Sequence, residues 1–260
     1  AFDIVGCSSK FEDVVSGNTP TTYQIPIEVL REHTCTPAKY DPRRILFPWS
    51  LLAGNPGAFF GKWVEIFPML RTPIALFVDS ISRRTSYSPE RFFNMVLALE
   101  GLHRFQCSDS DGISETHTEK VESILGAAPV EYRKWLRQKL KYSHEPSLRR
   151  RLKDLAKPFM DILVWLLGAE GSAGQQKKRC LRILGAIVDS RNALAHSLPV
   201  TAKNPADRYY YFTGIVELLM AMHLMKEIGI EDEAISDRMR NNYSTSQYRK
   251  RLVQFLSENV

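Results

Sequence analysis

The sequence predicts a mainly α-helical protein, in which a helical bundle follows a smaller N-terminal segment that is irregular or contains β-strands. Two observations favour this class: apolar residues recur at helical spacing from about residue 88 onward, and prolines gather before residue 57. A third is the stretch 205–228, which is apolar almost all round and therefore suits the centre of a bundle. With 260 residues, the chain has room for one large domain or two modest ones.

The N-terminal third is punctuated by proline. Tyr23–Ile27 suits an edge strand or an extended loop better than a helix. A short amphipathic helix is expected at about 59–70, and a compact apolar run, 74–78, follows Pro73. We interpret residues 1–87 as the tail of an N-terminal region packed against residues 88–260, which form the helical domain.

The helical domain begins with a clear start signal. Ser88, Pro89 and Glu90 combine an N-cap hydroxyl, a proline at the first helical position and an acid near the positive end of the helix dipole. Further helices are expected at about 117–125, 130–142, 147–155, 158–167, 175–195, 205–228, 231–241 and 245–257. The glycine-rich stretch 168–174 lacks the Lys-Ser/Thr of a P-loop, so nucleoside triphosphate binding is not expected there.

Charge and cysteine content limit the functional class. The net charge of +6 is compatible with a nucleic-acid partner, although many enzymes have a similar balance. The four cysteines lie far apart without metal-ligand spacing, so we expect free thiols in a reducing cytoplasm, no metal site and no cofactor. Because no apolar stretch approaches 18 residues, no membrane span is expected.

The most informative motif is the hexamer from Arg191 to His196, at the end of the helix expected at 175–195. Asn192 and His196 are four residues apart and share a helix face, whereas Arg191 lies about 140° from His196 on a regular helix. Pro199 follows closely, which predicts a helix end near His196.

These residue types suit RNA cleavage without a metal. A histidine can take the 2′-OH proton or protonate the leaving 5′-oxygen near neutral pH. A guanidinium such as that of Arg191 can stabilise the charge that develops at phosphorus, and Asn192 can orient the imidazole or bond a phosphate oxygen. A capping or solvated histidine beside a surface Arg-Asn pair explains the same residues, and the residues alone leave both interpretations open.

The hexamer resembles the R-x4–6-H signature of HEPN domains, with the frequently seen Asn directly after Arg. The blocks 91–93, 99–104, 132–136, 146–152 and 224–229 are similar to the Apea-like HEPN group, and together the resemblance covers about residues 88–242. It implies a helical bundle that forms a homodimer, with a composite active site at the interface. It also implies a metal-independent endoribonuclease that leaves 2′,3′-cyclic phosphate ends and acts in bacterial anti-phage defence by abortive infection, as a toxin against host RNA. Residues 1–87 would then be the end of the family's variable N-terminal region, which is expected to sense the trigger.

Several other residues are candidates for the site. Glu100, His103 and Arg104 can lie together on the first helix of the bundle, where Glu100 would orient Arg191 or His196; a local ion pair is an equally good explanation. The resemblance places Glu100 in the catalytic set with Arg191, Asn192 and His196. The candidate RNA-binding residues are His103, Arg104, Arg149, Arg150, Arg151 and Lys153.

The last four of these candidates belong to a basic run between residues 133 and 153. This run could follow an RNA backbone while Trp135 and Tyr142 stack on bases. A solvated helix face explains such a run equally well. Tyr209, Tyr210 and Tyr211 cannot all face one way, so at least one is expected in the core.

Three functions therefore stay open at this point. The first is a homodimeric endoribonuclease with RNA as its substrate, tRNA included, and a phage-derived trigger. The second is a non-catalytic HEPN module that binds RNA or protein. The third is the toxin half of a toxin–antitoxin pair.

Overall fold

The computed structural model describes residues 2–13, 21–32, 46, 51–82, 89–107, 115–198 and 205–259. The chain forms two compact units, residues 1–42 and residues 43–260.

The first unit is a β-hairpin. Strands β1 (Phe2–Asp13) and β2 (Thr21–Glu32) pair antiparallel, with Phe2 opposite Glu32 and Asp13 opposite Thr21. In a two-stranded sheet each strand is an edge, which is where a residue without an N–H such as Pro26 is tolerated.

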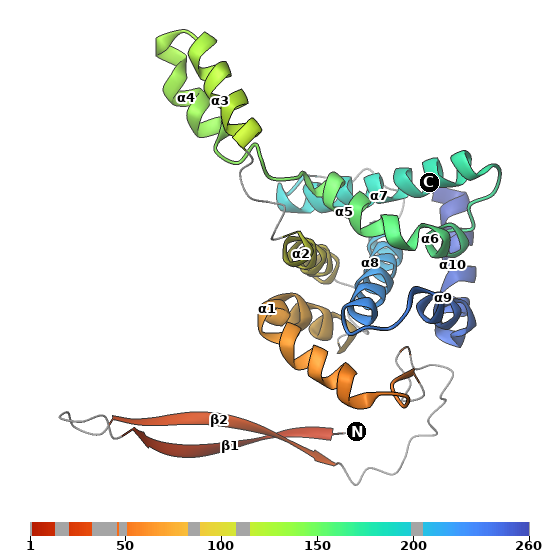
Figure 1. Ribbon diagram of the computed structural model, residues 1–260. Helices are drawn as coiled ribbons and strands as arrows, with labels where there is room; N and C mark the ends of the chain where they lie inside the picture. Colours follow the sequence, from red (N-terminus) through yellow and green to blue (C-terminus); the bar gives the residue numbers. More distant parts are fainter. Residues whose placement is uncertain are drawn as a thin grey trace. The chain divides into compact units, whose positions relative to one another are not determined.

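The second unit is built from helices, and the prediction of a mainly helical chain is confirmed (Figure 1). The helices are α1 (Pro56–Ser82), α2 (Pro89–Gln106), α3 (Glu115–Ala127), α4 (Val130–Leu140), α5 (Leu148–Ala156), the 3-10 turn η3 (Lys157–Phe159), α6 (Met160–Leu166), α7 (Ala173–Ala195), α8 (Pro205–Glu227), α9 (Asp232–Asn241) and α10 (Tyr243–Asn259). From α2 onward each lies within a few residues of its predicted range. The proposed N-cap Ser88 lies outside the described residues.

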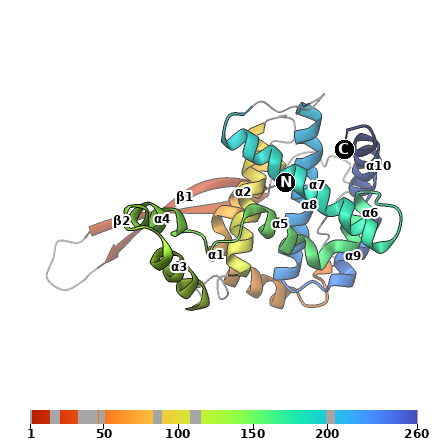
Figure 2. The same cartoon turned by 90° about the horizontal axis from the view of Figure 1, so that it is seen from above.

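Helix α8 is the centre of this unit, as its sequence predicts. It packs against α1, α2, α5 and α9 (Figures 1 and 2). Its methionines Met220, Met222 and Met225 are all buried, as packing residues. Tyr209, the first of the three tyrosines, is buried too, with its ring centroid 5.3 Å from that of Phe92 in α2.

Helix α1 is longer than predicted. It runs from Pro56 to Ser82 through both Pro68 and Pro73, where the sequence suggested a helix ending near residue 70. Packing explains the difference: Pro73 is buried against Gly101 of α2, which has no Cβ to obstruct the ring. The close contact joins α1 to the helical unit, and the two compact units divide after Pro42. A family domain that begins near residue 88 stays a prediction.

Among the described residues, no helix is both long enough and apolar enough to cross a membrane.

A buried histidine ties three helices together. His223 of α8 is 3% exposed; its Nε2 lies 2.8 Å from the Leu155 carbonyl oxygen of α5, and its Nδ1 lies 3.0 Å from Nε2 of Gln106 in α2. A neutral ring that donates from Nε2 and accepts at Nδ1 satisfies both contacts. Burial, with smaller contributions from the charges of Lys226 and His103, lowers the pKa of His223 to about 4, although the hydrogen bond to Leu155 and the charge of Asp232 oppose the shift.

We expect this histidine to make the fold acid-sensitive. The unfolded chain binds a proton near pH 6.5 and the folded chain only near pH 4, so stability from this group is lost as pH falls through that window. Across this window the free energy of unfolding should fall by a total of the order of 3 kcal/mol. Urea unfolding at several pH values between 7 and 4 should show a smaller fall for His223→Gln than for wild type or for His117→Gln on α3. Equal slopes in all three proteins would contradict this assignment.

The contact between Pro73 and Gly101 gives a second expectation. A Cβ built at Gly101 lies 2.7 Å from Cγ of Pro73, and a proline ring cannot rotate away. Gly101→Ala should therefore lower the free energy of unfolding by about 1–3 kcal/mol, as other overpacked sites do. Gly126→Ala in α3 is the control, because nothing lies within 4 Å of its Cβ position. A Gly101→Ala protein as stable as the control would mean that α1 and α2 are not tightly packed there.

Candidate functional site

The apolar stripe of α7 determines where Arg191 lies. The helix begins at a capping box, in which Ser172 and Gln175 satisfy each other's backbone N–H groups. Cys180, Ile183, Leu184, Ile187 and Val188 then form its buried face. Arg191 follows Ile187 by four residues and Val188 by three, so its side chain leaves α7 on the side that packs against other helices.

Arg191 is held between two residues of α2. Its Nη2 donates to Oε1 of Glu100 at 2.9 Å, and its guanidinium carbon lies 5.2 Å from the ring centroid of Phe93. Nη1 lies 3.4 Å from Oδ1 of Asn192. The side chains of Arg191 and Glu100 are only 22% and 11% exposed, so this ion pair is weakly screened by solvent.

His196 stands at the C-terminus of α7, as the motif predicts. Ser197 has a φ of +52°, the N–H of Leu198 donates to the Ala193 carbonyl, and that of Ser197 donates to the Leu194 carbonyl. These bonds form a Schellman motif, with serine at the left-handed position that glycine usually takes. The helix therefore ends at Ala195, and His196 is an exposed cap residue. Pro199 lies outside the described residues.

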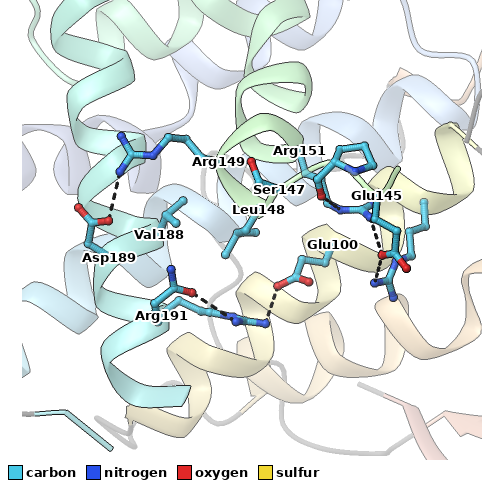
Figure 3. A pocket seen from close by; sticks show the side chains of 12 residues that line it. Glu100, Glu145, Ser147, Leu148, Arg149, Arg151, Val188, Asp189 and Arg191 are labelled. Carbon is cyan, nitrogen blue, oxygen red and sulfur yellow. Dashed lines mark hydrogen bonds and ion pairs between the residues drawn. The ribbon is translucent and has the colours of Figure 1, made fainter. Parts of the chain in front are cut away.

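A cavity of about 530 Å³ brings together most of the predicted site residues (Figure 3). Helix α2, the start of α5 with the residues before it, and the last turns of α7 form its wall. The lining residues are Glu100, Arg104, Glu145, Pro146, Ser147, Leu148, Arg149, Arg151, Val188, Asp189, Arg191 and Asn192. His196 is not part of this lining.

Every arginine in the cavity wall has a carboxylate partner. Arg191 pairs with Glu100 at 2.9 Å, and Arg149 pairs with Asp189 at 3.1 Å. Glu145 accepts from both Arg151, at 3.3 Å, and Arg104, at 3.5 Å. The four guanidinium groups and three carboxylates leave the wall close to neutral, so an incoming anion must replace a carboxylate partner or take an unused N–H.

Arg149 of α5 passes close to Gly185 where it pairs with Asp189 of α7. A Cβ at Gly185 would lie 3.2 Å from Nη1 of Arg149, so the guanidinium would have to shift slightly if a side chain were present. Both members of this pair are mostly exposed, 64% for Arg149 and 69% for Asp189. Such pairs contribute roughly 0–1 kcal/mol and break easily.

His103 and Arg151, two of the predicted RNA-binding residues, are buried, at 2% and 3% exposure, and so present little surface to a ligand. Arg151 donates to the Pro146 carbonyl at 3.0 Å, and its Nη1 lies 3.3 Å from Nδ1 of His103. Nε2 of His103 in turn lies 3.6 Å from Sγ of Cys107 and 3.8 Å from Oδ2 of Asp154. A buried arginine must satisfy its donors internally, so these two residues support the cavity wall.

The remaining predicted RNA-binding residues are exposed. Arg104 and Arg149 line the cavity. Arg150 forms an ion pair with Asp154 one turn along α5, at 2.7 Å, and Lys153 is exposed on the same short helix. The basic run is therefore divided between the cavity wall, buried support and a solvated face.

Sequence reasoning missed three residues of the site. Phe93 lies seven residues before Glu100, a spacing that places both on one face of α2 and could have revealed it. Asp189 lies three residues before Asn192 in α7, but nothing local indicates that Arg149 would reach it. Glu145 precedes α5 in a turn, and its two arginine partners come from different elements.

Within the described ranges, no group of three or more His, Cys, Asp or Glu side chains is arranged to hold a metal ion. Cys107 and Cys180 are free thiols, and burial raises the pKa of Cys180 to about 11.

The helical unit and the Arg-Asn-x3-His end of α7 define a HEPN domain, a class of helical domains that is generally ribonuclease-like. The model of the Apea-like HEPN family matches residues 93–234, from α2 into α9, and the chain belongs to this family. Searches of curated proteins and of solved structures give no significant match.

The partial burial of Arg191 and Glu100 can be tested by a double-mutant cycle. With Glu100→Ala, Arg191→Ala and the double variant, we expect a coupling energy of about 1–3 kcal/mol in urea unfolding, because either single change leaves a poorly solvated charge. The cycle of Arg149→Ala and Asp189→Ala is the control, with an expected coupling of less than about 1 kcal/mol. Similar coupling energies in the two cycles would show that Glu100 does not anchor Arg191.

Proposed function

We propose that this chain is a metal-independent endoribonuclease of the HEPN type that acts in bacterial anti-phage defence by abortive infection. The observation that carries the proposal is the meeting of Glu100, Arg191 and Asn192 in one cavity, from helices that are far apart in the sequence. Membership of the Apea-like HEPN family supports the same activity.

The proposed reaction needs only the chain's own side chains. The 2′-OH of the RNA loses its proton and attacks the adjacent phosphorus, the bond from phosphorus to the 5′-oxygen breaks, and that oxygen takes up a proton. The products are a 2′,3′-cyclic phosphate and a 5′-hydroxyl. His196 transfers a proton, Arg191 stabilises charge on the phosphate oxygens, and Asn192 orients the reacting groups.

Glu100 is proposed to position Arg191. One N–H of the guanidinium is committed to Glu100 at 2.9 Å, and Phe93 supports its face. Nε of Arg191 is buried without a hydrogen-bond partner in the described part of the chain. A guanidinium fixed before the substrate arrives needs little reorganisation in the transition state.

The exposed pairs at the rim suit exchange with phosphate. Arg149 and Arg104 are 64% and 58% exposed in their ion pairs, so replacing Asp189 or Glu145 by a phosphate oxygen costs little. Helix α5 begins at Ser147 in the cavity wall, and helix N-termini favour anions. RNA would therefore enter over α5 and reach Arg191 behind it.

His196 is proposed to act in a homodimer. It is exposed at the end of α7 and is not part of the cavity lining of its own chain. In the composite site that the family resemblance implies, the α7 ends of two copies meet, and His196 of each copy completes a shared cleft. The RNA target, tRNA included, and a phage-derived trigger belong to the same proposal.

The experiment is cleavage of total RNA and of bulk tRNA in EDTA, with wild type, His196→Ala and Arg191→Ala side by side. We expect wild-type cutting to survive chelation and to leave cyclic-phosphate ends. His196→Ala should lose about 10²-fold or more of the rate, as for a lost general acid or base. Arg191→Ala should lose about 10²–10³-fold, as for a lost oxyanion donor.

Lys178→Ala is the matched control, because it removes an exposed cation from the same helix without touching the cavity. Its activity should equal that of wild type. A folded, dimeric wild type that cuts no RNA under any condition would favour a non-catalytic binding module. Equal cutting by wild type and His196→Ala would place the active site elsewhere.

A further inference from the structure

Helix α4 displays a stripe of exposed aromatic side chains that the proposed site does not use. Tyr132, Trp135 and Tyr142 are 55%, 56% and 61% exposed, and α4 has no buried residue. Tyr132, Trp135 and Lys139 are spaced at i, i+3 and i+7. Lys141 keeps helical backbone angles, so Tyr142 continues the same side, within an arc of about 80°. We call these four residues, Tyr132, Trp135, Lys139 and Tyr142, the α4 stripe.

The helix that carries the stripe is basic. It holds four basic residues, Arg133, Lys134, Arg137 and Lys139, against one acid, Glu131. Arg133 is used internally, because it donates to the carbonyls of Gly126 and Ala128 at the end of α3, and Arg137 lies 3.8 Å from Glu122. Lys134 and Lys139 have no hydrogen-bond or ion-pair partner in the part of the chain that the structure describes. Exposed rings with unpaired cations beside them are the combination that binds single-stranded nucleic acid.

We propose that the α4 stripe binds unpaired bases of a single-stranded RNA segment next to the cleavage site, an inference that rests on the proposed ribonuclease function. Trp135 and the two tyrosines stack on successive bases, and Lys139 contacts the backbone between them. Stacking requires unpaired bases, so the stripe selects single-stranded regions over duplex.

The chain connects this stripe directly to the cavity. The N–H of Glu145 donates to the carbonyl oxygen of Tyr142 at 3.1 Å, so the end of the stripe and the cavity wall share one tight turn. Glu145 is in turn held by Arg151 at 3.3 Å and by Arg104 at 3.5 Å. A strand lying along the stripe thus ends beside Arg104, one of the exposed arginines of the cavity.

Charge and composition argue against the other occupants of such a surface. A second copy docked about a two-fold axis would bring the unpaired Lys139 of each chain together on a basic face. A membrane-surface helix buries a broad aliphatic face, whereas the α4 stripe holds only Tyr, Trp and Lys. The leucines of α4, Leu136 and Leu140, lie outside this arc and are half-buried.

The test is fluorescence anisotropy with a fluorescein-labelled 12-nucleotide RNA whose 2′-hydroxyls are methylated, so that it cannot be cut. Trp135→Ala should weaken binding about ten-fold, a typical loss for one stacked base, and Trp135→Phe should retain most of the affinity. Phe60→Ala is the control, because Phe60 is equally exposed, at 56%, but lies on α1. The same RNA annealed to its complement should bind more weakly than the single strand, and Trp135→Ala should reduce that preference.

Unchanged RNA affinity in folded Trp135→Ala and in the triple variant Tyr132→Ala/Trp135→Ala/Tyr142→Ala would overturn the proposal. Under that result, loss of binding to phosphatidylserine vesicles would assign the stripe to a membrane, and a smaller oligomer in sedimentation would assign it to a second copy. Because the RNA cannot be cut, the assay measures binding to the stripe independently of the proposed ribonuclease activity. Stripe-dependent binding by a protein that cuts no RNA would support the surface and reject the enzyme, whereas cutting with stripe-independent binding would do the reverse.

Discussion

The ion pair between Arg191 and Glu100 is the interaction on which the site depends. The register of α7 carries Arg191 onto the side that packs against other helices, where an unpaired guanidinium would be costly. Glu100 of α2 offsets that cost, and Phe93, about two turns earlier on the same helix, packs against the guanidinium. The result is a cation whose position is set by the packing of α2 against α7. A phosphate that reaches it therefore meets a fixed charge rather than a flexible side chain.

The other charges of the cavity are arranged in two layers. Arg151 and His103 form a buried layer, in which Arg151 bonds to His103 and to Pro146 and Glu145 in the turn before α5. Arg149 and Arg104 form an exposed layer in front of it, where each is paired with a carboxylate that solvent screens. This division separates the arginines that maintain the wall from those that can change partners. A count of basic residues in the sequence cannot distinguish the two groups.

Much of the fold could be predicted from the sequence because the helices obey local rules. The start at Pro89, the end of α7 near His196 and the apolar helix α8 each follow from caps, breakers or periodicity over a few turns. The length of α1 could not be predicted in this way, because Pro73 lies inside the helix and packs against Gly101, 28 residues later. The site shows the same limit. Glu100 could be placed through the family resemblance, whereas the burial of Arg151 and the reach of Arg149 to Asp189 depend on how three helices pack.

The end of α7 shows how local geometry and chemistry are combined. A Schellman motif stops the helix one residue before His196, and it does so with Ser197 in a left-handed conformation that costs an L-residue about 1–2 kcal/mol. A glycine there would avoid the cost but would also let the chain beyond His196 take many more conformations. Ser197 lowers the stability of the folded chain but restricts the backbone beside the imidazole of His196. In the proposed homodimer, a restricted position at an exposed helix end suits His196 better than a buried one, because the imidazole would need no rearrangement of the bundle to reach the second copy.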